Sequence, residues 1–166
     1  MTDDRGRING GHPPSVVRHL SSDLQRAAVV AEARSWLGTP YHNCADIKGV
    51  GVDCGMLLVR VFVDSGLVPA FDPRPYPPDW HFHRGEERYL GFIAGRCGEV
   101  EAPQPGDVVV FRIGRCYAHG GIVTALAPLT IVHAYHQARR VIEEDITHDS
   151  RLMAPVRKPR FFSYFR

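Results

Sequence analysis

Hydrophobic residues form one nearly unbroken run in the first half of the chain, MLLVRVFV at positions 56–63. Together with the residues that flank it, this run is long for a β-strand, and Gly66 stands where glycine commonly follows a helix. Apolar side chains on all sides indicate that the helix is covered on most of its surface. The pattern therefore predicts a buried helix in which Asp53 is the N-cap and Cys54 lies in the first turn.

A second helix is predicted upstream, from about Asp23 to Trp36. Its apolar and small residues recur along one narrow stripe, at Leu24, Ala27, Ala28, Ala31 and Ser35. Ser22 followed by Gln25 fits a capping box at the start of this helix, and Gly38 ends it. We expect this helix mainly to support the fold.

Proline dominates the segment after the buried helix, with five prolines from Pro69 to Pro78. This density excludes a regular element, so we expect an ordered loop, followed by a short helix from about Gly85 to Gly95. His81 and His83 lie between them without a carboxylate or thiol at ligand spacing. We therefore expect surface histidines there rather than metal ligands.

The second half of the chain changes to β-rich runs with short connections, which favour an antiparallel meander. The runs lie at 107–111, 119–124, 130–134, 139–144 and 160–165. Helices followed by strands indicate an α+β fold with the buried helix packed on the sheet. For a chain of 166 residues with 44% hydrophobic content, we expect a flexible or docking arm at 1–20 and a single domain at 21–166.

Charge and hydropathy exclude several classes of protein. The formal net charge is +2 and no run of Lys and Arg occurs, so nucleic-acid binding is not expected. No apolar stretch approaches the roughly 18 residues of a membrane span, and the N-terminus lacks the features of a secretory signal. The cysteines form no CxxC pair, and we expect reduced thiols, although a disulfide between Cys44 and Cys54 remains open. They are Cys44, Cys54, Cys97 and Cys116.

Cys54 is the first candidate for chemistry. A thiol at a helix N-terminus faces the positive end of the helix dipole, which favours the reactive thiolate, although many free cysteines are buried and inert. A nucleophilic cysteine also needs an imidazole and a third group that orients it. His119 and His133, on successive predicted strands, can face the same helix N-terminus, with His136 and Gln137 as alternatives for the third group.

Five segments occur in one order between about Ala31 and Ile146, namely WLGTPY, GVDC, PGDVVVF, AHGGIV and IVHA. This series resembles the NlpC-type cell-wall peptidases, the superfamily called NlpC and p-sixty. The resemblance implies a pared-down papain-like fold, in which the nucleophile helix packs on an antiparallel sheet of about five strands. We expect no cofactor and no metal.

The resemblance also assigns roles. It implies that Cys54 is the nucleophile, His119 the general base and His133 the residue that orients it. Tyr41 matches a tyrosine beside the active site, where its hydroxyl and the backbone N–H of the nucleophile are candidate oxyanion donors. Asp53 matches the acid that contacts a free N-terminal L-alanine of the peptide stem in some members.

One departure concerns the residue after the nucleophile. The family usually has serine there, and this chain has Gly55.

The implied reaction is hydrolysis of an amide bond in peptidoglycan stem peptides, typically between D-γ-glutamate and a diamino acid. Alternatives are a structural component with weak or no activity, an acyltransferase or amidase on another substrate, and a cytosolic muropeptide-recycling peptidase.

The chain also resembles the branch of this superfamily carried in bacteriophage tails. The similar features are its small size, the loop Lys48–Cys54 and the insertion PYPPDW. The resemblance implies a virion tail component that opens the cell wall during DNA delivery, with tail-tip or hub proteins as partners. We expect a docking face at 71–80, together with the N-terminal arm, or else a loop that covers its own core.

Overall fold

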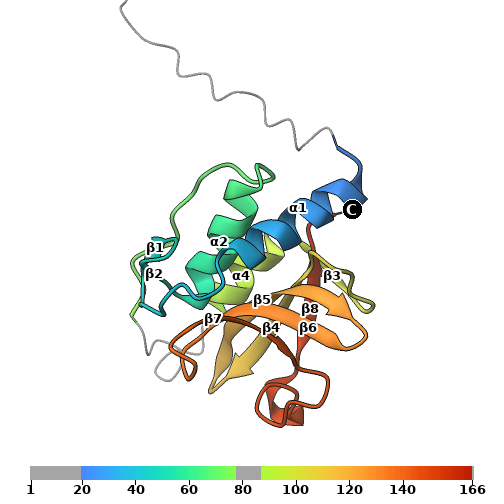
Figure 1. Cartoon of the computed structure of the whole chain (residues 1–166). Helices are drawn as coiled ribbons and strands as arrows, with labels where there is room; N and C mark the ends of the chain where they lie inside the picture. Colours follow the sequence, from blue (N-terminus) through green and yellow to red (C-terminus); the bar gives the residue numbers. More distant parts are fainter. Residues whose placement is uncertain (1–19, 78–86, 166) are drawn as a thin grey trace, which may run out of the picture.

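The computed structural model describes residues 20–77 and 87–165. Their centre is a six-stranded antiparallel sheet in the order β3-β8-β4-β5-β6-β7 (Figure 1). Its strands are β3 (Gly98–Val100), β4 (Val108–Ile113), β5 (Cys116–Leu126), β6 (Leu129–Tyr135), β7 (Arg140–Asp145) and β8 (Arg160–Ser163). A short hairpin of β1 (Asp46–Ile47) and β2 (Gly51–Val52) precedes the central helix.

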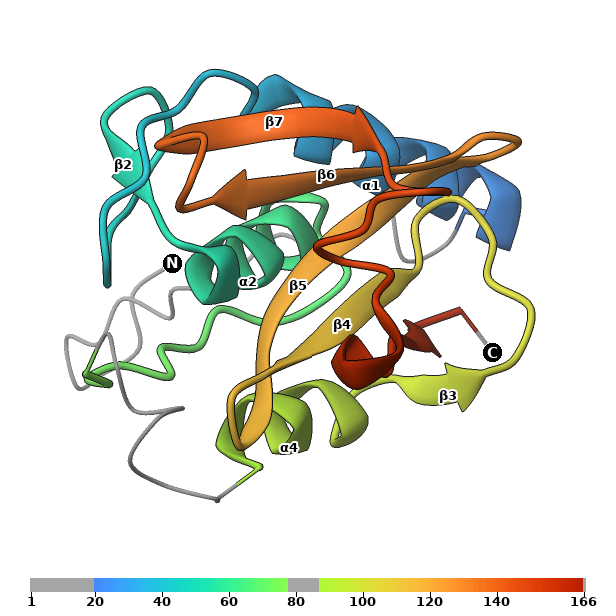
Figure 2. The same cartoon turned by 90° about the horizontal axis from the view of Figure 1, so that it is seen from below.

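The central helix is α2 (Cys54–Asp64), which packs against β5 and β6 (Figure 2). Asp53 caps it, since its Oδ1 accepts a hydrogen bond of 2.8 Å from the backbone N–H of Met56. After its end, Gly66 takes a positive φ of 70°, which glycine adopts without strain. The helix predicted from the hydrophobic run is thus confirmed, with its cap and its terminating glycine.

The sheet has a core on each face, as the alternation of side chains along a strand requires. Val108 and Val110 of β4 pack in the cluster that contains α2, whereas Val109 and Phe111 belong to a second cluster on the other face. The segment after β7 covers this second face and buries Leu152 there. The antiparallel α+β architecture is therefore confirmed.

Several boundaries differ from the sequence-based expectation. The main sheet has six strands rather than about five, because β3 pairs with β8 and was not predicted. α1 (Ser22–Ser35) has Ser21 as its N-cap without a side-chain cap bond, so the predicted capping box is wrong. α4 (Arg88–Ala94) is shorter than predicted. The arm at 1–20 lies outside the described residues up to position 19, so it stays a prediction.

A polar contact fixes α1 against the sheet. The guanidinium of Arg26 donates to the carboxylate of Asp107 at 2.7 Å and to the carbonyl of Pro105 at 3.0 Å. It also donates to the hydroxyl of Ser163 in β8 at 3.0 Å. Asp107 is only 1% exposed, so this pair is buried and links three segments.

We expect Asp107→Ala to lower the free energy of unfolding by about 3 kcal/mol or more, because it leaves the Arg26 guanidinium buried without its counter-charge. Glu99→Ala, which breaks the exposed pair with Arg160, is the matched control and should cost less than about 1 kcal/mol. Urea denaturation followed by circular dichroism measures both. Equal effects would contradict the structural role of the Arg26–Asp107 pair.

Candidate active site

The N-terminus of α2 places Cys54 against β5. Its thiol donates to the carbonyl of Ala118 at 3.6 Å, and the backbone N–H of Gly120 stabilises its thiolate form. Sulfur therefore lies beside the residues on both sides of His119. Position 120 requires glycine, because a Cβ there would lie 2.7 Å from the Tyr89 hydroxyl and 2.9 Å from the carbonyl oxygen of Val109. All four cysteines are free thiols, so the disulfide left open between Cys44 and Cys54 is not formed.

A chain of hydrogen bonds runs across three neighbouring strands from His119. Its Nε2 lies 2.9 Å from Nδ1 of His133 in β6, and Nε2 of His133 lies 3.0 Å from the carboxylate of Glu144 in β7. A carboxylate only accepts, so His133 carries its proton on Nε2 and accepts at Nδ1. His119 then donates from Nε2, which leaves its Nδ1 without a proton.

The structure thus joins His119 to His133, which is fully buried, rather than to the alternatives. His136 packs edge-on against the ring of Tyr41, with centroids 5.2 Å apart, and Gln137 is exposed. Glu144 was missed by the sequence reading, although the register contains a signal for it. Since β7 pairs Ile142 with His133, Glu144 is the diagonal neighbour of His133 on the same face.

The electrostatics of the resting site favour a neutral thiol and a neutral imidazole. Burial, with the Asp53 carboxylate as the next cause, raises the pKa of Cys54 to about 12. Burial and the neighbouring His133 hold the pKa of His119 well below 6.5. The expectation of a resting thiolate considered the helix dipole and the two histidines, and burial beside an acidic residue opposes it.

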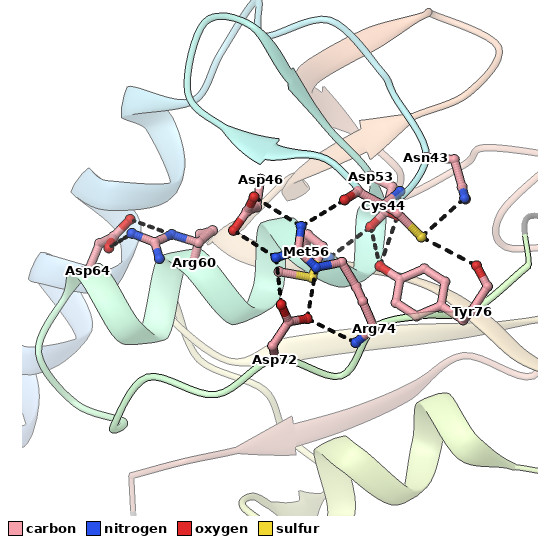
Figure 3. A network of polar contacts seen from close by, with 10 residues as sticks. All are labelled: Asn43, Cys44, Asp46, Asp53, Met56, Arg60, Asp64, Asp72, Arg74 and Tyr76. Atoms are coloured by element: carbon pink, nitrogen blue, oxygen red, sulfur yellow. Dashed lines mark hydrogen bonds and ion pairs between the residues drawn. The ribbon is translucent and has the colours of Figure 1, made fainter.

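Asp53 is not open to solvent, being only 2% exposed. Its Oδ2 accepts from the backbone N–H of Cys44 at 2.7 Å, and the hydroxyl of Tyr76 lies 2.9 Å from both of its oxygens (Figure 3). Together with the cap bond from Met56, these contacts surround the carboxylate with protein donors. The predicted contact of Asp53 with a substrate amine therefore meets an occupied site in this structure.

Tyr41 lines the same cavity as Cys54. Burial, followed by the charges of Cys54 and Asp53, raises the pKa of Tyr41 far above its usual range, so its phenol stays protonated. Its backbone N–H donates to the carbonyl of Arg139 at 2.9 Å. The hydroxyl of Tyr89 lies 3.4 Å from the carbonyl of Cys54.

A cavity of about 240 Å³ opens beside Cys54, between α2, α4 and the proline-rich segment (residues 69–77). Its walls are mostly apolar and aromatic, and they include Leu58, Phe62, Phe71, Tyr76, Phe92 and Tyr164. Phe71 stacks on Phe92 and lies under Arg96, and Tyr76 bonds to Asp53. These two aromatic residues of the expected docking face therefore turn inward, while Trp80 lies outside the described residues.

Within residues 20–77 and 87–165, no group of three or more His, Cys, Asp or Glu side chains could hold a metal ion. His81 and His83 lie outside these ranges, so their expected surface role stays a prediction. No helix in the described part of the chain is long and apolar enough to cross a membrane.

Comparison with known proteins finds no matching family profile and no matching curated sequence. Solved structures do match. The NlpC/p60 domain of the peptidoglycan hydrolase SagA aligns with a TM-score of 0.55 and 21% identity over 83% of this chain and 97% of that domain. An N-acetylmuramoyl-L-alanine amidase from Bacteroides uniformis aligns with a TM-score of 0.58 and 12% identity, over 86% of this chain and 99% of the amidase.

NlpC1 from Trichomonas vaginalis aligns with a TM-score of 0.57 and 14% identity, over 82% of this chain and 42% of the longer protein. The fold is thus that of a papain-like α+β domain with a cysteine at the start of its central helix. In particular, it is the NlpC/p60 form of that fold.

We expect the rate of Cys54 alkylation by iodoacetamide to keep rising to about pH 10, because burial and Asp53 raise the thiol pKa. Asp53→Asn keeps a capping side chain but removes the charge, so its alkylation curve should shift toward lower pH by about one unit. Mass spectrometry of the Cys54 peptide follows the reaction, with glutathione as the control thiol. A plateau below about pH 8.5 in the wild type would instead establish a resting thiolate.

Proposed function

We propose that this chain is a cysteine peptidase that hydrolyses an amide bond in peptidoglycan stem peptides. The observation that carries the proposal is that Cys54, at the start of α2, contacts the carbonyl of Ala118, the residue before His119, and that His119 begins the hydrogen-bonded series with His133 and Glu144. This arrangement supplies a nucleophile, a general base and an orienting pair. The shared fold with a peptidoglycan hydrolase domain and a muramoyl-alanine amidase supports peptidoglycan as the substrate.

The reaction begins from the neutral pair. Nδ1 of His119 accepts the thiol proton as the sulfur of Cys54 attacks the amide carbon. The backbone N–H of Cys54 and the hydroxyl of Tyr41 are the donors proposed for the oxyanion. The imidazolium returns its proton to the leaving amine, and a thioester remains. Water, deprotonated by the same imidazole, then hydrolyses the thioester and restores the thiol.

The bond proposed for cleavage joins D-γ-glutamate to the diamino acid, as the resemblance to NlpC-type peptidases implies. The proposed site of action is a phage or prophage tail, because the loop Lys48–Cys54 and the proline-rich insertion resemble the tail-associated branch. Mass spectrometry of purified particles tests this location. Recovery of the chain only from the cytosol would favour a muropeptide-recycling enzyme.

We expect purified protein to cleave defined muropeptides at the D-γ-glutamyl bond and Cys54→Ala to abolish cleavage. Mass spectrometry of the products identifies the bond. Cleavage between muramic acid and L-alanine would establish an amidase instead. No product from any muropeptide, with a correctly folded sample by circular dichroism, would favour a structural component.

Glu144 should act through His133 on the orientation of His119. We expect Glu144→Ala to lower kcat by about 10- to 100-fold with little change in KM, and Glu144→Gln to recover part of the loss because its amide oxygen can accept. Glu143→Ala is the matched control, since Glu143 bonds to Arg34 and Thr124 instead. Equal losses for Glu143→Ala and Glu144→Ala would show that strand stability, not orientation, is affected.

A further inference from the structure

Asp53 already accepts hydrogen bonds from three donor groups of the protein. A carboxylate offers about four lone-pair sites. Oδ1 accepts from the backbone N–H of Met56 at 2.8 Å and Oδ2 from that of Cys44 at 2.7 Å, and the Tyr76 hydroxyl lies 2.9 Å from each oxygen. A substrate ammonium could reach this carboxylate only by displacing the phenol of Tyr76.

Tyr76 is held in this position by neighbouring contacts. Its carbonyl accepts from the thiol of Cys44 at 3.3 Å. The guanidinium of Arg74 donates to the carbonyl of Cys44 at 2.8 Å and to the carboxylate of Asp46 at 3.0 Å (Figure 3). Charge-assisted bonds of this kind are stronger than neutral ones. Arg74 and the carbonyl of Tyr76 thus fasten the proline-rich segment to Cys44 and Asp46.

The residue after the nucleophile fits this arrangement. A Cβ at position 55 would lie 3.3 Å from the Tyr76 hydroxyl and 3.5 Å from the ring of Tyr89. The first distance is tighter than ordinary van der Waals contact, and a serine would add an oxygen to the same space. Glycine at 55, where the resembling family usually has serine, therefore leaves room for the phenol of Tyr76.

We infer that Tyr76 occupies the place on Asp53 that the free N-terminal ammonium of a stem peptide would need, so that the site takes stem peptides whose N-terminus is amide-linked, as in intact, glycan-attached peptidoglycan. This inference rests on the proposed function. An acylated nitrogen carries no charge, so it needs no counter-ion in the largely apolar cavity, whereas an ammonium without Asp53 would be desolvated there at high cost. Burial and Asp53 also raise the pKa of Tyr76, which keeps its phenol protonated as the donor.

The first test compares two synthetic stem peptides that differ only at the N-terminal L-alanine, one with a free amine and one N-acetylated. The wild type should cleave the acetylated peptide with a kcat/KM equal to or above that of the free peptide. Tyr76→Phe, which releases Asp53, should shift this ratio toward the free peptide by about tenfold. Tyr117→Phe, which loses a tyrosine hydroxyl bonded to Lys158 away from the site, is the matched control. A wild-type preference of tenfold or more for the free amine would overturn the inference.

A second test does not depend on peptidase activity. Cys54 is modified with 2-aminoethyl methanethiosulfonate, which carries an ammonium, and with neutral methyl methanethiosulfonate, and mass spectrometry of the Cys54 peptide gives both rates. Relative to glutathione, the wild type should show no preference for the cation, while Tyr76→Phe should gain one of about fivefold. Tyr76→Ala also removes the aromatic ring, so its preference for the cationic reagent should rise by at least as much.

A cation preference already present in the wild type and unchanged by both Tyr76 variants would overturn the inference. If the wild type cleaves neither peptide, the proposed function fails, and the reagent ratios still decide whether Tyr76 closes Asp53. If both peptides are cleaved and the reagent ratios do not respond to Tyr76, the proposed function stands and the inference fails.

Discussion

A single buried carboxylate, that of Asp53, organises the region around Cys54. It fixes the first turn of α2 through Met56, the preceding loop through Cys44 and the proline-rich segment through Tyr76. A carboxylate that is 2% exposed must be satisfied by donors, because an unpaired buried charge costs several kcal/mol. Together with burial, which is the larger cause, the same group opposes ionisation of Cys54.

The second constraint is the register of three strands. His119, His133 and Glu144 lie on β5, β6 and β7, and they meet only because the pairing brings their side chains to the same face. A shift of one residue in β7 would turn Glu144 to the other face and bring Glu143 or Asp145 toward His133 in its place. The preference of Glu144 for its ionised form, which the hydrogen bond from His133 strengthens, keeps the tautomers of both imidazoles defined.

The local sequence pattern predicted those features that depend only on residues close together in the chain. The cap at Asp53, the first-turn position of Cys54 and the glycine after α2 follow from helix periodicity and cap chemistry, and the structure confirms them. Glu144 and Tyr76 were missed because their contacts span 11 and 23 residues and depend on strand register and loop path. β3, only three residues long, carries too little alternation to be recognised before its partner β8 is known.

The proline-rich segment is better explained as a wall of the site than as a free surface. Prolines restrict the unfolded chain, so the loop loses less entropy when its aromatic residues turn inward. Phe71 has a cation–π partner in Arg96, 3.9 Å from its ring centroid, and Tyr76 has a charged acceptor. Side chains with such partners are poor anchors for another protein, because docking would break the contacts that order them. The segment therefore limits the room beside Cys54.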